Sequence, residues 1–175
     1  MELSNRIRQL KTSPTRKLNP YAEEAERKGI KIYHLNIGQP DIETPKLFFD
    51  AIGKYNSKTL SYSHSRGIKP LLQNIQRYYD KMGIHYEEDE IVITYGGSEA
   101  VLFTMLAVFD EGDEILVAEP YYANYNSFCD VLNVKRNAVR TYAENGFHLP
   151  NREEIEKHIT PKTKAYMFSN PSNPT

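Results

Sequence analysis

The sequence predicts an α/β fold with a mostly parallel sheet. Between residues 91 and 168, short apolar runs alternate with segments of helical periodicity, which is the pattern of βαβ units. The connections between successive runs are long enough for the crossovers that parallel strands require. With 39% hydrophobic residues, the chain is lean for a folded protein of 175 residues, and its length favours one domain over two.

The composition excludes several classes of protein. Lysine and arginine number 22 against 23 acidic residues, so the net charge is −1 and no basic surface for nucleic acid is expected. No apolar run approaches the roughly 20 residues that span a bilayer, and the first residues lack the apolar core of a secretory signal. The single cysteine, Cys129, excludes an internal disulfide. We therefore expect a cytoplasmic protein without a membrane or nucleic-acid partner.

The chain up to residue 90 is expected to form an arm followed by helices. Asn19-Pro20 supplies an N-cap and a proline at the first helical position, and Gly29 is a typical helix stop. Gly83 has the same role for the last of these helices. The expected elements are a helix over 19–29, a strand over 31–35, a helix over 45–55, a polar loop over 57–67 and a helix over 71–82.

The rest of the chain alternates between strands and helices. We expect strands over 91–95, 114–118, 134–139 and 163–168, and helices over 98–109, 121–132 and 151–158. Asn151, followed three residues later by Glu154, is similar to a capping box. After the last strand the chain ends in Ser-Asn-Pro-Ser-Asn-Pro-Thr, without a crossover helix. Because such helices follow the strands of a parallel sheet, we expect a truncated part of a larger domain.

Three polar segments directly follow predicted strands. They are Gly96-Gly97-Ser98, Glu119-Pro120-Tyr121-Tyr122 and Asn170-Pro171-Ser172-Asn173. Ligands of open parallel sheets bind beyond the carboxyl ends of the strands. If the strands are parallel, the three segments converge on one site.

The residue types in these segments suit a phosphorylated planar ligand. Gly96 and Gly97 allow a ligand to approach the backbone, and Ser98 opens a helix whose free N–H groups attract an anion such as phosphate. The alternative is an ordinary turn with a serine cap. Tyr122 offers a ring for stacking, or else packs in the core. Asn173 offers an amide donor, or else only forms an Asn-Pro turn.

Other candidate residues carry weaker signals. Tyr62 lies in the polar loop, where function often resides, although a solvated loop is the simpler interpretation. The five histidines show no metal-ligand spacing, so no metal site is expected. Cys129 has no neighbouring histidine and is expected to be a small buried apolar residue rather than a nucleophile.

Taken together, these segments resemble a known family. The chain is similar to the N-terminal portion of the fold-type I pyridoxal-phosphate (PLP) enzymes, in the class I/II aminotransferase group that includes aspartate aminotransferase. The resemblance covers about residues 15–175. The matching stretches are Leu35-Asn36-Ile37-Gly38-Gln39-Pro40-Asp41, Tyr62 with Gly67 and Leu71, Ile93-Thr94-Tyr95-Gly96-Gly97-Ser98-Glu99-Ala100, Glu119-Pro120-Tyr121-Tyr122 with Tyr125, and Ser169-Asn170-Pro171-Ser172-Asn173-Pro174-Thr175.

The resemblance implies a fold and a set of site residues. It implies part of the three-layer PLP-transferase large domain over 45–175, preceded by an arm and a small-domain segment over 1–44. It implies a homodimer with shared active sites. The implied residues are Gly38 beside the substrate carboxylate, Gly96, Gly97 and Ser98 around the cofactor phosphate, Tyr122 stacked on the pyridine ring, Asn173 donating to the ring 3′-oxygen, and Tyr62 reaching the phosphate of the neighbouring subunit's cofactor.

The resemblance also implies an activity that this sequence alone does not complete. A parent aminotransferase would move an amino group between an amino acid and a 2-oxo acid. The lysine that forms the Schiff base has no counterpart in the matching positions here, so this chain is expected to be inactive alone. Two alternatives stay open: a fragment of a PLP-dependent lyase or synthase of the same fold, and a non-catalytic short module.

Overall fold

The structure is a computed structural model that describes residues 2–10, 16–36 and 38–175. Met1, residues 11–15 and Ile37 lie outside the described residues, so the arm and the Leu35–Asp41 stretch are described in part. The chain divides into two compact units: Met1–Tyr33 with Gly97–Thr175, and His34–Gly96. Each is described by itself. The predicted division at residue 44 stays a prediction.

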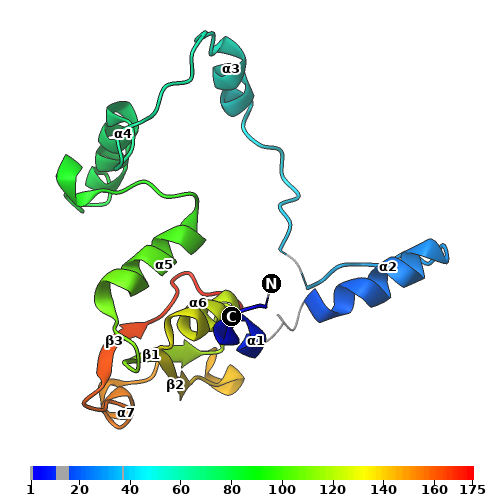
Figure 1. Ribbon diagram of the computed structural model, residues 1–175, viewed down its shortest axis with the longest axis vertical. Coiled ribbons are helices and arrows are strands. Elements are labelled where there is room, and N and C mark those ends of the chain that lie inside the picture. Colours follow the sequence, from blue (N-terminus) through cyan, green and yellow to red (C-terminus); the bar gives the residue numbers. More distant parts are fainter. Residues whose placement is uncertain (1, 11–15, 37) are drawn as a thin grey trace. The chain divides into compact units, whose positions relative to one another are not determined.

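The unit that contains residues 97–175 is built on a parallel sheet of three strands in the order β2-β1-β3 (Figure 1). The strands are β1 (Glu114–Glu119), β2 (Lys135–Arg140) and β3 (Thr163–Met167). Leu116 of the central strand lies opposite Asn137 on one side and Tyr166 on the other. The predicted parallel α/β fold is therefore confirmed for this part of the chain, with strand limits within a residue or two of those expected.

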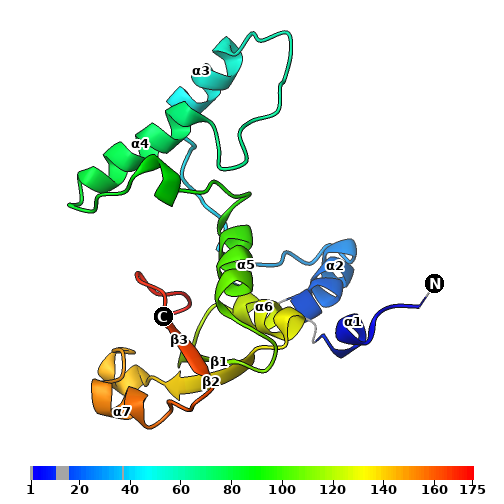
Figure 2. The same cartoon turned by 60° about the vertical axis from the view of Figure 1, so that its left-hand side comes forward.

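Helices cover both faces of this sheet (Figures 1 and 2). On one face lie α5 (Gly97–Val108) and α6 (Asn124–Leu132). On the other lie η3 (Ala143–Asn145) and α7 (Arg152–Glu156), where Asn137 Nδ2 donates to the carbonyl oxygen of His158 at 2.8 Å. Asn151 caps α7 as predicted, because its side chain accepts from the N–H of Glu154 at 2.9 Å.

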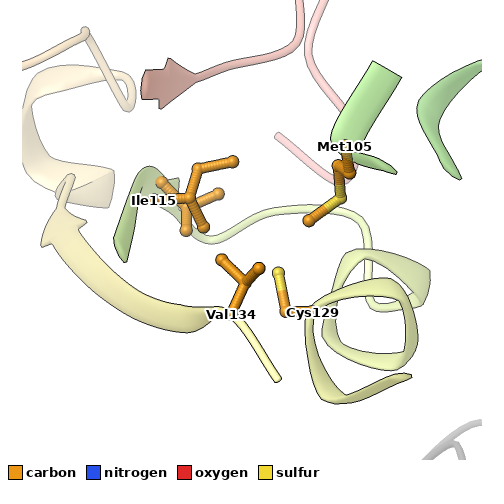
Figure 3. Packing of buried hydrophobic residues seen from close by; sticks show 5 residues of the cluster. Met105, Ile115, Cys129 and Val134 are labelled. Atoms are coloured by element: carbon orange, nitrogen blue, oxygen red, sulfur yellow. The ribbon is translucent and has the colours of Figure 1, made fainter. Parts of the chain in front are cut away.

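The main core lies between the sheet and the two helices α5 and α6. Met105, Ile115, Cys129 and Val134 point toward one another in Figure 3, and each is less than 5% exposed. Alternate positions of the strands bury a second layer on the opposite face, because successive side chains of a strand point to opposite faces. Leu116 and Val139 lie there, at 1% and 0% exposure.

A buried carboxylate joins the amino ends of the strands. Glu114 begins β1, and its side chain is only 5% exposed. Its Oε1 accepts from Lys135 Nζ at 2.8 Å, and its Oε2 accepts from Thr160 Oγ1 at 2.7 Å. These bonds link the central strand to β2 and to the turn before β3. Because the carboxylate is both paired and hydrogen-bonded, its burial is offset.

The unit His34–Gly96 buries little of its apolar surface. It contains α3 (Lys46–Lys54), α4 (Lys69–Asp80) and η2 (Glu88–Glu90). Both helices and the polar loop between them confirm the predictions, and Gly83 ends α4 with a φ of +74°. Among the described residues of this unit, only Leu72 and Ile91 are buried apolar side chains.

The strand predicted over Ile91–Tyr95 is not formed. Ile93 N–H donates to the carbonyl oxygen of Arg66 at 2.8 Å, but within the described residues no strand ladder continues from it. Gly67 packs closely against the side chain of Ile93, because a Cβ added at Gly67 would come within 2.4 Å of Ile93 Cγ1. The described segment therefore contacts the loop at Arg66 and Gly67 without forming a strand, since a strand needs a paired neighbour.

The first residues form short helices: α1 (Asn5–Gln9), η1 (Arg16–Leu18) and α2 (Asn19–Arg27). Asn19 is the first residue of α2, whereas it was expected to be the cap. The strand predicted over 31–35 is wrong: the described backbone there has no sheet partner, and Leu35 is 96% exposed. Among the described residues, none of the helices combines the length and apolar character needed to cross a bilayer.

Candidate functional site

The carboxyl ends of β1 and β3 bring two of the three predicted segments together. The two strands pair in parallel, so the chain leaves both at the same edge of the sheet. Tyr121 and Tyr125 follow β1, and Asn173 follows β3. All three side chains line one small cavity at this edge, together with Thr141 and Ser172. Two of the three predicted segments therefore contribute to this cavity, whereas Gly96-Gly97-Ser98 and Tyr122 are not among the residues that line it.

Three tyrosines around the start of α6 form what we call the aromatic platform: Tyr121, Tyr122 and Tyr125. Tyr121 and Tyr125 stack with ring centroids 6.2 Å apart and an angle of 16° between the rings. Tyr122 meets Tyr125 edge to face at 5.7 Å. Both geometries are favourable for aromatic pairs. Tyr122 is 39% exposed, so it is the ring of the platform with a face left for a ligand.

Hydrogen bonds hold the hydroxyl groups of the platform. Asn124 Nδ2 donates to Tyr122 Oη at 2.7 Å, and Tyr121 Oη donates to Asn126 Oδ1 at 2.8 Å. Burial raises the pKa of Tyr121, against the opposing effect of the Arg136 guanidinium. The Tyr121 hydroxyl is therefore protonated at neutral pH and acts as a donor, which makes it a structural group rather than an acid–base group.

Asn173 lies in the exposed segment after β3. The neighbouring side chains give that segment its own hydrogen bonds: Ser169 Oγ donates to the carbonyl oxygen of Pro171 at 3.1 Å, and Ser172 Oγ lies 2.9 Å from Thr175 Oγ1. Asn173 lines the cavity that Tyr121 and Tyr125 also line, and an asparagine amide carries two N–H donors.

Helix α5 presents an open N-terminus. Gly97 and Ser98, its first residues, are exposed, and a Cβ added at Gly97 would meet nothing within 4 Å. Gly96, the last residue of the other unit, is equally open and has a φ of +82°, which favours glycine. The free N–H groups of a twelve-residue helix suit an anion. One turn later, Val101 packs against the core cluster that Tyr121 and Tyr125 also contact.

The remaining predicted residues belong to the other unit. Tyr62 is fully exposed in its loop, and Gly38 is exposed with open space around it. Their places in a site with the aromatic platform stay predictions. Tyr121 was missed as a site residue by sequence reasoning. The available signal was its position just beyond the carboxyl end of a strand, which it shares with Tyr122.

The chemistry of metals and thiols finds no support in the described residues. Among residues 2–10, 16–36 and 38–175 there is no group of three or more histidine, cysteine or acidic side chains that could hold a metal ion. Cys129 is 0% exposed, and burial raises the pKa of its thiol. It packs as an apolar side chain. The described residues thus include a helix N-terminus that suits an anion, an exposed tyrosine ring and an amide side chain at the cavity, which are the groups that a planar ring carrying a phosphate would require.

Comparison with known proteins identifies the family. The model of the class I and II aminotransferases matches residues 30–175. The aspartate/prephenate aminotransferase of Thermus thermophilus is 32% identical over 176 residues, and the (5-formylfuran-3-yl)methyl phosphate transaminase of Methanocaldococcus jannaschii is 33% identical over 174 residues. These matches cover 99% and 98% of this chain, respectively, and 45% of each relative.

A solved structure agrees. The aspartate aminotransferase of Rhizobium meliloti superposes with a TM-score of 0.89 at 28% identity, covering 100% of this chain and 44% of its own. The chain therefore spans somewhat less than half the length of the relatives that it matches. Aminotransferases of this class depend on pyridoxal 5′-phosphate. Because the family model covers residues 30–175 and the parallel sheet superposes on a solved aminotransferase, this chain belongs to the class I and II aminotransferases.

Proposed function

We propose that this chain forms the part of an aminotransferase that binds the phosphate and the ring of PLP. The observation that carries the proposal is the shared cavity at the sheet edge, which Tyr121 and Tyr125 after β1 line together with Asn173 after β3. The substrates of the whole protein would be an amino acid and a 2-oxo acid, because the relatives named above are transaminases.

Different residues are proposed to bind different parts of PLP. The N–H groups at Gly97 and Ser98 hold the phosphate, with Gly96 keeping the approach open. Tyr122 stacks on the pyridine ring. Asn173 donates its amide proton to the ring oxygen. When bound, PLP supplies an electron sink for the α-carbon of the amino acid, and the protein orients it.

Two residues of the unit His34–Gly96 complete the proposed site. Gly38 lies beside the substrate carboxylate, and Tyr62 reaches the cofactor phosphate of a second subunit. The Tyr62 side chain is fully exposed, and α3 contains no buried residue, so this unit presents surface that a second copy can cover. We accordingly propose a homodimer in the cytoplasm. Light scattering of the purified chain at several concentrations tests the dimer, and a monomer at all of them would contradict it.

We also propose that these 175 residues do not transaminate by themselves. By the family resemblance, none of their lysines corresponds to the lysine that carries the cofactor and moves the α-proton. Treatment with PLP and borohydride, followed by intact mass and peptide mapping, should give no stoichiometric adduct at one lysine. A single fully modified lysine, or formation of 2-oxo acid from an amino acid, would overturn this proposal.

The binding proposal is tested by comparing PLP with pyridoxal, which lacks the phosphate. A Gly97→Ala variant should bind PLP several-fold more weakly and bind pyridoxal as the wild type does, because the new methyl group intrudes only on the anion. The protein itself should tolerate the change, since the added Cβ meets nothing within 4 Å and alanine favours helix.

A Tyr122→Ala variant should weaken both ligands by about 2- to 12-fold, which corresponds to the roughly 0.5–1.5 kcal/mol of an aromatic contact. Tyr142→Ala is the matched control, because Tyr142 is a 53% exposed tyrosine of the same unit outside the platform. Equal affinities for PLP and pyridoxal in the wild type, or equal effects of the two tyrosine substitutions, would contradict the assignment.

A further inference from the structure

The first turn of α6, which contains Tyr125 of the aromatic platform, has no side-chain cap. Ala123 occupies its N-cap position and makes no side-chain hydrogen bond there. The main chain of this turn is bonded there, since Tyr125 N–H donates to the carbonyl oxygen of Tyr122 at 3.0 Å and Asn126 N–H to that of Ala123 at 3.2 Å, but these bonds do not fix the directions of side chains. The orientation of Tyr121 and Tyr122, which lie just before this turn, therefore depends on contacts made elsewhere.

Asn126 supplies one such contact. Its Oδ1 accepts from Tyr121 Oη at 2.8 Å, and its main-chain carbonyl oxygen accepts from Arg136 Nη1 at 2.9 Å. Both bonds are partly buried, where hydrogen bonds compete less with water. Asn126 thus joins the platform to the edge strand β2.

Arg136 holds α6 at a second point. Its Nη1 also lies 2.5 Å from Asp130 Oδ1, and the two side chains are only 27% and 30% exposed. Asn126 and Asp130 are four residues apart and so share one face of α6. Both bonds come from the same nitrogen, whose two N–H groups lie in the rigid plane of the guanidinium, so the directions of the two bonds are fixed relative to each other. Strand β2 therefore holds α6 at two points one turn apart.

We propose that Arg136 is a positioning residue that sets the tilt of Tyr122 toward a bound ring, acting through Asn126 and Tyr121. Tyr121 stacks on Tyr125, and Tyr125 meets Tyr122 edge to face, so the tilt of each ring constrains the next. This inference rests on the proposed function in one respect: Tyr122 is the ring that stacks on the cofactor.

The test uses three variants of the whole chain. Arg136→Met removes the charge and the donors while keeping an apolar stem. Arg136→Lys keeps the positive charge but replaces the planar guanidinium with a single ammonium group. Arg140→Met is the matched control, because Arg140 lies on the same strand but sits over the ring of Tyr142, 5.5 Å from its centroid.

Two readouts separate positioning from general destabilisation. The first needs no cofactor: ring resonances of labelled tyrosines should shift at Tyr121, Tyr122 and Tyr125 in Arg136→Met and stay in place in Arg140→Met. The second is the visible circular dichroism of added PLP together with its Kd. In Arg136→Met we expect a smaller dichroism band and a Kd raised by about 2- to 10-fold, the range of one aromatic contact. Arg136→Lys should lie between wild type and Arg136→Met in both readouts.

The possible failures are distinguishable. Unmoved platform resonances in a folded Arg136→Met would overturn the role of Arg136, whatever the cofactor does. If the wild-type chain gives no visible dichroism with added PLP, the proposed function is contradicted. The tyrosine resonances would still test the role of Arg136 in that case. If Arg136→Met does not fold, Asn126→Ala removes the acceptor of Tyr121 and keeps the Arg136–Asp130 pair. That variant must then move the same three tyrosine resonances, or the proposal fails.

Discussion

The segments 97–175 and 34–96 differ in how many of their apolar side chains are buried. In the first, a parallel sheet buries apolar side chains on both faces, and Leu116, Val117, Val139 and Cys129 are almost fully enclosed. In the second, two helices and long connections leave nearly all apolar side chains exposed among the described residues. Residues proposed to bind the cofactor ring thus stand on a packed scaffold. Gly38 and Tyr62 lie in a segment in which few of the described side chains are buried.

The largest expected effect of a single substitution lies in the sheet. Leu116→Ala should lower the free energy of unfolding by about 2–5 kcal/mol, because the side chain is 1% exposed and its loss leaves a cavity. Urea unfolding measures the change. Leu60→Ala, at a side chain that is 83% exposed in the polar loop, is the control. Similar losses in both variants would contradict the contrast between the two segments.

The next effect appears on acidification. Hydrogen bonds from Lys135 and Thr160 hold the pKa of Glu114 below its ordinary value of 4.5. A carboxyl with a lowered folded-state pKa contributes stability that is complete above the unfolded pKa and is lost as pH falls through the folded one. The wild type should therefore lose stability below about pH 4.5 in a step that Glu114→Gln lacks. Urea midpoints between pH 7 and pH 3 measure this step, and the exposed Glu144→Gln should retain it.

A smaller loss of stability is expected when the cap of α7 is removed. Asn151→Ala removes the cap of α7 and should cost about 1 kcal/mol, because the N–H of Glu154 loses its acceptor. Hydrogen exchange should quicken over 152–158 first. Asn151→Ser keeps a capping oxygen and should restore most of the protection. Unchanged exchange in the alanine variant would show that the cap contributes nothing.

The smallest effect is expected in α3. Ile52→Lys replaces a side chain that is 59% exposed, so the free energy of unfolding of the isolated chain should change by no more than about 0.5 kcal/mol. The same variant should weaken self-association if α3 faces a second copy. A large loss of stability in a monomeric sample would mean that α3 is buried in solution, and the contrast drawn above would fall.

Much of the fold was predictable because local chemistry and tertiary packing agree there. Asn151 with Glu154 marked the start of α7, and Gly83 marked the end of α4. The alternation of apolar runs gave β1, β2 and β3 and their parallel arrangement. Prediction failed where local composition and tertiary packing disagree. Residues 31–35 and 91–95 have the composition of strands, but a strand forms only beside a pairing partner. The described residues offer no such partner to either segment.

The candidate site was predictable in part for a similar reason. Positions after strands can be read from sequence, so Tyr122 and Asn173 were identified as candidates. Tyr121 follows the same strand and had the same positional signal, but its hydrogen bond to Asn126 and its stacking on Tyr125 have no sequence signature. The proposed role of Arg136 could not be predicted from the sequence either, because Arg136 lies in β2 whereas the tyrosines follow β1.

The order of strands in the sheet has a consequence for synthesis on the ribosome. β1 is the central strand and also the first of the three to be made. β2 then joins one of its edges, and β3 joins the other once residue 167 has emerged. Each new strand is added to an open edge of a nascent sheet, and none has to be inserted between two strands already paired.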